Sequence, residues 1–173
     1  MKPITGRMMC QEVGADQFDP PEPAAGFMFV SGEMLRAAQI LGQADPLPSV
    51  ALTHLVGHVV ETALKGMLSH HGLDLKAIEK LGHRLTALWR RAEEQGIPLP
   101  SQPPIWLEQL DRVHKAPYPN RYPVNCHGVV LPAQEAMLQG AIDLHKTATR
   151  FIAELQPGSD LDLTQGKPEA THD

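Results

Sequence analysis

Residues 49–70 read SVALTHLVGHVVETALKGMLSH, and they carry the clearest helical pattern in the chain. Apolar side chains recur there at steps of three and four, at Leu52, Val56, Val59, Ala63 and Met67. Because an α-helix turns about 100° per residue, this spacing places them along one face. Gly72 follows as a natural helix terminator. The stretch predicts a helix over about 49–70 that buries one apolar face.

Weaker stripes of the same kind predict four more helical segments. The first is a helix capped by Ser31, and the second is a short turn at Gly82 followed by a helix over about 83–95. The third is a short helix over about 104–115, which carries an Asp111/Lys115 pair on its surface. The last helix runs from after Pro132 to about Gln156. No segment alternates with the period of two that is typical of a strand. We therefore predict an all-α fold, an antiparallel up-and-down helical bundle of four to five helices.

The two ends of the chain differ from this helical part. Residues 1–26 hold the stretch DPPEP at 19–23, and consecutive prolines prevent a helix, so we expect an irregular N-terminal segment. Pro157-Gly158 stops the last helix, and residues 157–173 are polar without a stripe, which is typical of a disordered tail. The predicted folding domain is therefore 27–156.

Composition excludes several classes of protein. Aromatic residues make up only 5% of the 173 residues, so the core must be largely aliphatic, which favours helices. A net charge of −5 argues against a duplex-DNA binder. No apolar run reaches the roughly 18 residues of a membrane span, and we see no signal peptide. Cys10 and Cys126 form no disulfide framework. We expect a cytoplasmic protein that has no contact with membranes.

Four polar residues share the face of the 49–70 helix opposite its apolar stripe: His54, His58, Glu61 and Lys65. His54, His58 and Glu61 are spaced i, i+4 and i+7, so they could present three ligands to one metal ion. The alternative is a solvated or dimer-facing polar strip, and we expect no bound metal or cofactor. His83 comes directly after Gly82, where we expect it to bond to a backbone group or pack against a neighbour.

A second candidate site lies in the proline-rich segment before the last helix. Arg121 and His127 are separated by five residues. An arginine binds phosphate through two parallel hydrogen bonds, and a histidine moves protons near neutral pH, so the pair could cleave RNA without a metal ion. Tyr118 and Tyr122 flank Arg121 and could hold a base. The alternative is that Arg121 pairs with an acidic residue and that His127 is an ordinary loop residue.

Several short motifs resemble those of the HEPN helical domain over about residues 31–155. They are ETALKGML at 61–68, His71-Gly72, GHRLTAL at 82–88 and Arg121-Tyr122-Pro123 ahead of a long final helix. The resemblance implies an all-α bundle that dimerises, with Arg121 and His127 as the catalytic pair of a metal-independent ribonuclease. It also implies catalytically silent relatives, such as antitoxin-like or RNA-associated proteins, some of which work beside a nucleotidyltransferase-type partner. The sequence departs from the family pattern at Tyr122-Pro123, directly after the arginine.

Three functions therefore remain open at the level of sequence. The first is a HEPN-like homodimer that cleaves RNA or is a silent relative. The second is a non-enzymatic module whose polar strip binds a partner protein or nucleotide. The third is a metal-binding helical bundle that uses His54, His58 and Glu61. The motifs of P-loop, dinucleotide-binding, zinc-protease and serine-hydrolase sites do not occur in the sequence.

Overall fold

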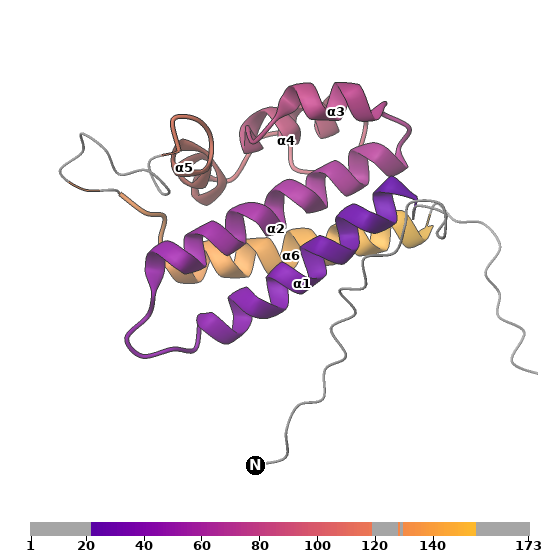
Figure 1. Ribbon diagram of the computed structural model, residues 1–173. Coiled ribbons are helices and arrows are strands. Elements are labelled where there is room, and N and C mark those ends of the chain that lie inside the picture. Colours follow the sequence, from indigo (N-terminus) through magenta and orange to yellow (C-terminus); the bar gives the residue numbers. More distant parts are fainter. Residues whose placement is uncertain (1–21, 119–127, 129, 155–173) are drawn as a thin grey trace, which may run out of the picture.

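The computed structural model describes residues 22–118, 128 and 130–154, and all regular structure in these residues is helical. The helices are α1 (Pro23–Leu41), α2 (Ser49–His70), α3 (Leu75–Leu81), α4 (Leu85–Glu94), α5 (Ile105–His114) and α6 (Gln134–Glu154), shown in Figure 1. The predicted all-α class is confirmed. The described residues contain six helices, because the region around Gly82 forms two helices and not a turn and one helix.

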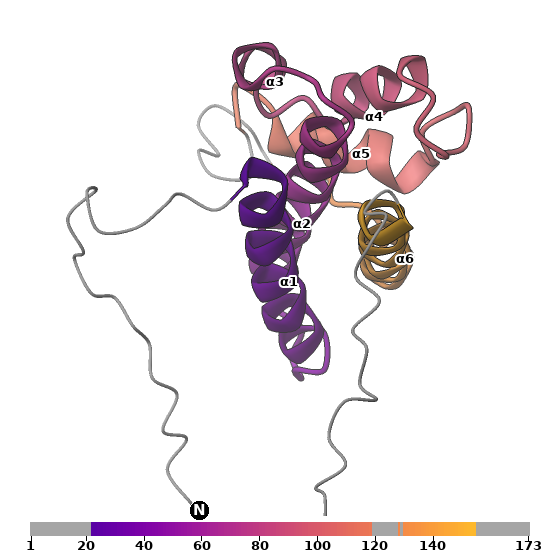
Figure 2. The ribbon, with the colours of Figure 1, turned by 90° about the vertical axis from the view of Figure 1, so that its right-hand side faces the viewer.

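Helix α2 is the centre of the molecule. It contacts each of the other five helices. Figures 1 and 2 show α1 and α6 along one side of it and α3, α4 and α5 on the other. The predicted stripe is confirmed, since Val56 and Val59 and the flanking Val60 and Leu64 are completely buried, but Glu61 on the opposite face is buried as well, at 4% exposed. Helix α2 is therefore covered on more than the single apolar face that its sequence predicts.

Helix α1 begins earlier than expected, at Pro23, so residues 23–26 are helical and do not belong to an irregular segment. A proline is tolerated in the first turn, where its missing N–H would have no helical partner. Ser31 is not a cap. It lies within the helix, fully buried, donates a hydrogen bond to the Val59 carbonyl (3.1 Å), and its hydroxyl is 2.9 Å from Nδ1 of His145. Burial lowers the pKa of His145.

Helices α3 and α4 are joined by a sharp turn at Gly82, whose φ of 59° is a conformation that glycine adopts without strain. The side chain of Asp111 in α5 then fastens the start of α4, because it accepts hydrogen bonds from the Thr86 amide (3.3 Å) and the Thr86 hydroxyl (2.9 Å). Lys115 also pairs with Asp111 (2.8 Å). This pair forms as expected, but only Lys115 lies at the surface, with its side chain 41% exposed, whereas Asp111 is 2% exposed.

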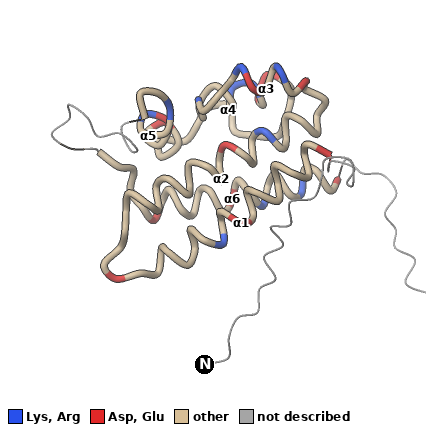
Figure 3. Tube along the Cα trace, viewed as in Figure 1, with Lys and Arg blue, Asp and Glu red and all other residues tan. Residues whose placement is uncertain are grey.

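Charged residues are unevenly distributed among the described helices. Lys and Arg alternate with Asp and Glu around α3 and α4, as Figure 3 shows. Helix α2 has only two charged residues, Glu61 and Lys65, in 22 positions. None of the described helices combines the length and the apolar character that crossing a membrane requires.

Gly140 allows α6 to lie directly against α5. A Cβ at this position would lie 2.5 Å from Cζ2 of Trp106, so the indole would have to move. We expect Gly140→Ala to lower the free energy of unfolding by about 1–2 kcal/mol, because overpacking outweighs the higher helix propensity of alanine. Urea denaturation measures the change.

Gly26 provides the matched control, because it lies in α1 and a Cβ there would have no neighbour within 4 Å. Gly26→Ala should leave stability unchanged or raise it by up to about 1 kcal/mol. If both variants were stabilised equally, the close contact between α5 and α6 would be contradicted.

Candidate functional site

The carboxylate of Glu61 is buried inside the protein, although it belongs to the face of α2 that we expected to be polar and solvated. The residue is 4% exposed. It accepts three hydrogen bonds: from Lys65 Nζ to Oε1 (2.6 Å), from His83 Nδ1 to Oε2 (2.9 Å) and from His114 Nε2 to Oε2 (2.8 Å). We call Glu61, Lys65, His83 and His114 the Glu61 cluster. The expectation of a solvated strip is wrong at its central residue.

Each member of the Glu61 cluster is placed by a local feature of the chain. Lys65 lies one helical turn after Glu61, a spacing at which opposite charges meet. His83 follows the turn at Gly82 and points back to α2. His114 is the last residue of α5, one turn beyond the buried Asp111 that fixes α5 to α4. The cluster thus joins α2 to the α3–α4 turn and to α5.

Gly57 makes the approach of His114 to α2 sterically feasible. A Cβ on Gly57 would lie 2.8 Å from Cε1 of the His114 ring and closer still to its Nδ1. A glycine inside a helix costs about 1 kcal/mol relative to alanine. Here it provides the space in which the imidazole reaches Glu61. The His114 side chain is 2% exposed, so it meets the carboxylate away from water.

The electrostatic balance of the cluster favours a charged Glu61. Burial by itself raises the pKa of a carboxyl group, because it disfavours the charged form. The hydrogen bonds from His114, Lys65 and His83 together outweigh that effect, and the pKa of Glu61 lies well below its usual range. Because a carboxylate only accepts hydrogen bonds, Nε2 of His114 and Nδ1 of His83 must each carry a hydrogen.

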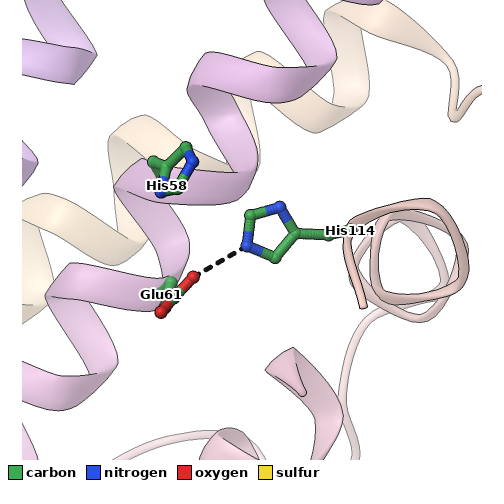
Figure 4. A group of neighbouring side chains, drawn as sticks. All are labelled: His58, Glu61 and His114. Atoms are coloured by element: carbon green, nitrogen blue, oxygen red, sulfur yellow. Dashed lines mark hydrogen bonds and ion pairs between the residues drawn. The ribbon is translucent and has the colours of Figure 1, made fainter. Parts of the chain in front are cut away.

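Further rings surround the cluster. The His58 ring stands edge-on to that of His114, with centroids 5.2 Å apart, and His54 is 4.8 Å from His58. His58, Glu61 and His114 each offer one ligand atom, and these atoms lie within 4.8 Å of one another. In Figure 4, His58 and Glu61 extend from successive turns of α2 and His114 reaches toward them from α5. Two imidazoles and a carboxylate in this arrangement can either hold a metal ion or position a proton.

The structure brings together some of the residues that the sequence singled out. Glu61 and Lys65 pair, and the rings of His54 and His58 contact each other. Tyr118 is half-buried, and its ring centroid lies 5.8 Å from that of His83. Arg121, Tyr122 and His127 lie outside the described residues, so the structure does not test the proposed catalytic pair.

His114 was not among the residues singled out from the sequence, because His114 lies 53 positions from Glu61 and ends a short helix of ordinary appearance. Its only signal is indirect. Gly57 lies in the middle of the apolar stretch of α2, and a glycine inside a helix, which costs stability, often marks a close approach by another element. His83 was expected to bond to a backbone group or pack against a neighbour. It packs against the rings of His114 and Tyr118, as expected, but its hydrogen bond goes to the Glu61 side chain and not to a backbone group.

Replacing Glu61 tests how much its charge stabilises the fold. Glu61→Gln removes the charge and directs amide hydrogens at groups that already donate, so we expect a loss of roughly 3 kcal/mol in the free energy of unfolding at pH 7. A group whose pKa is lowered by folding stabilises the protein above its unfolded pKa of about 4.3. The difference between wild type and variant should therefore be full above about pH 5.5 and shrink as the pH falls below about 4.

Glu79→Gln is the control for this series, because Glu79 is exposed on α3. It should change stability by less than about 0.5 kcal/mol. Chemical denaturation at several pH values from 7 to 3 gives both curves. A Glu61→Gln deficit that stays constant down to pH 3 would show that the carboxylate charge does not stabilise the fold.

The Glu61 cluster also joins two short motifs of the sequence. Glu61 opens the stretch ETALKGML at 61–68, and His83 belongs to GHRLTAL at 82–88. Their side chains, 22 positions apart, are hydrogen-bonded at 2.9 Å. No known protein family, curated protein or solved structure matches this chain.

Proposed function

We propose that this protein is a HEPN-like helical protein that acts on RNA, and that Arg121 and His127 provide metal-independent cleavage of the RNA backbone. One observation carries the proposal: two of the motifs behind the resemblance, residues 61–68 and 82–88, meet in space. Glu61 of the first motif binds His83 of the second, and Tyr118, three positions before Arg121 in the sequence, contacts His83 with its ring. Contacts between residues of different motifs favour a common origin with the HEPN domain over a chance similarity of short sequences.

The proposed chemistry needs only the two side chains. His127, as a general base, takes the proton of a ribose 2′-hydroxyl, and the 2′-oxygen then attacks the adjacent phosphorus. The bond from phosphorus to the 5′-oxygen breaks, which leaves a 2′,3′-cyclic phosphate and a 5′-hydroxyl that takes up a proton. The Arg121 guanidinium stabilises the negative charge that develops on the phosphoryl oxygens.

In this proposal the Glu61 cluster has a positioning role. Glu61 fixes the orientation of His83, and His83 supports the Tyr118 ring at the point where the chain leaves α5. Tyr118 and Tyr122 would contact bases, since aromatic rings stack on unpaired nucleotides. The resemblance further leads us to propose an up-and-down bundle that works as a homodimer, with a nucleotidyltransferase-type protein as a candidate partner.

The test is cleavage of a fluorescent single-stranded RNA by the purified full chain. Arg121→Ala and His127→Ala should each lower the cleavage rate by at least about 100-fold, because each removes a group that acts on the transition state. Addition of EDTA should not change the rate, since neither group requires a metal ion. The product should carry a 2′,3′-cyclic phosphate, which mass spectrometry identifies.

Two exposed residues serve as controls: Arg150 on α6 and His71 after α2. Arg150→Ala and His71→Ala should cleave RNA at the wild-type rate. Equal rates in all four variants, or cleavage that EDTA abolishes, would overturn the proposed ribonuclease. RNA that is bound but left intact by the wild-type protein would instead identify the non-enzymatic binding module.

A further inference from the structure

We infer that His58, Glu61 and His114 form a binding site for a divalent transition-metal ion of the Zn²⁺ class. The inference goes beyond the proposed RNA chemistry, which needs no metal ion. It starts from the placement of the three side chains, since one ligand atom from each lies within 4.8 Å of the others. Two of them lie three positions apart on α2 and therefore share a face, and the third reaches that face from α5.

The donor atoms select the kind of ion. Two imidazole nitrogens and one carboxylate oxygen are ligands that Zn²⁺ and its neighbours prefer, whereas Ca²⁺ and Mg²⁺ prefer oxygen atoms alone. Glu61 is 4% exposed and His114 is 4% exposed, so both ligands are held away from bulk water. A set of three protein ligands leaves a fourth tetrahedral position for a water molecule.

The three ligand atoms, which lie within 4.8 Å of one another, would move by at most about 1.5 Å to bind such an ion. At about 2.0–2.1 Å from zinc, two tetrahedral ligand atoms are roughly 3.3 Å apart. Oε2 of Glu61 and Nε2 of His114 are 2.8 Å apart, so the ion would take the place of the hydrogen between them and separate them slightly. His58 would approach from the adjacent turn of α2.

His83 would hold the carboxylate in place, because it binds Oε2 on a second lone pair. A group of this kind behind a ligand orients it and supports its affinity. Lys65 binds the other oxygen, Oε1. The Lys65 ammonium, however, also repels a dication, because both would interact with the same carboxylate. This repulsion predicts a specific effect, tighter binding of the metal when the charge of Lys65 is removed.

This ligand set differs from the one that spacing alone indicates. His54, His58 and Glu61 lie along α2 at i, i+4 and i+7. The group of ligand atoms that the structure brings together contains His114 in place of His54. The two sets therefore make opposite predictions for His54→Ala, which removes a ligand from the first set and none from the second.

The experiment is titration of Co²⁺ into chelator-treated full-length protein. We expect one equivalent to bind with the visible absorption of a four-coordinate Co²⁺ site, and Zn²⁺ to displace it. His58→Ala and His114→Ala should weaken binding at least about 30-fold. His54→Ala and the exposed His71→Ala should bind as wild type does, and Lys65→Met should bind about tenfold more tightly. Circular dichroism identifies any variant that has lost its helices.

The outcomes separate this inference from the proposed ribonuclease. Arg121→Ala, inactive under that proposal, should bind Co²⁺ with wild-type affinity, so metal binding is measured independently of cleavage. His58 is only half-buried, so its variant provides a second test if His114→Ala does not fold. The metal site is refuted if wild-type protein binds no stoichiometric Co²⁺, or if folded His58→Ala binds it as tightly as wild type. Loss of binding in His54→Ala would refute the ligand set.

Discussion

The arrangement of α2, α5 and the α3–α4 turn depends on the buried negative charge of Glu61. A carboxylate removed from water costs several kcal/mol unless it is paired and hydrogen-bonded. Glu61 meets that condition only when Lys65, His83 and His114 are all in place. The need to satisfy this charge therefore positions elements that are far apart in the sequence, and it brings several imidazoles to one point in the molecule.

The sequence predicts the fold class and most helices because the apolar side chains that a helix buries recur at a regular, local spacing. The stripe at Leu52, Val56 and Val59 indicated α2 correctly. The same reasoning was wrong about the opposite face. A helical projection assumes one buried and one solvated side, which holds for a helix at the surface. Helix α2 contacts all five other helices of the described part of the chain, and its own 22 residues do not indicate how many helices pack against it.

The candidate site was predictable only in its local part. The pairing of Glu61 with Lys65 follows from a spacing of four residues on a helix. The contacts of Glu61 with His83 and His114 span 22 and 53 positions, and such contacts depend on how the helices pack. Ser31 shows the same limit. A serine suits a helix start, but this one satisfies its hydroxyl inside α1 by bonding to the Val59 carbonyl of α2.

The contact between Gly57 and His114 also restricts how α5 can slide along α2. Only a residue without a side chain leaves space for the ring, and the residues one helical turn before and after Gly57 on the same face, Thr53 and Val60, both carry one. A shift of α5 along α2 would press the imidazole against a Cβ. Helix α5 therefore has one docking position on α2, and the segment from Lys115 to Tyr118 leaves the helical core from a defined point and in a defined direction.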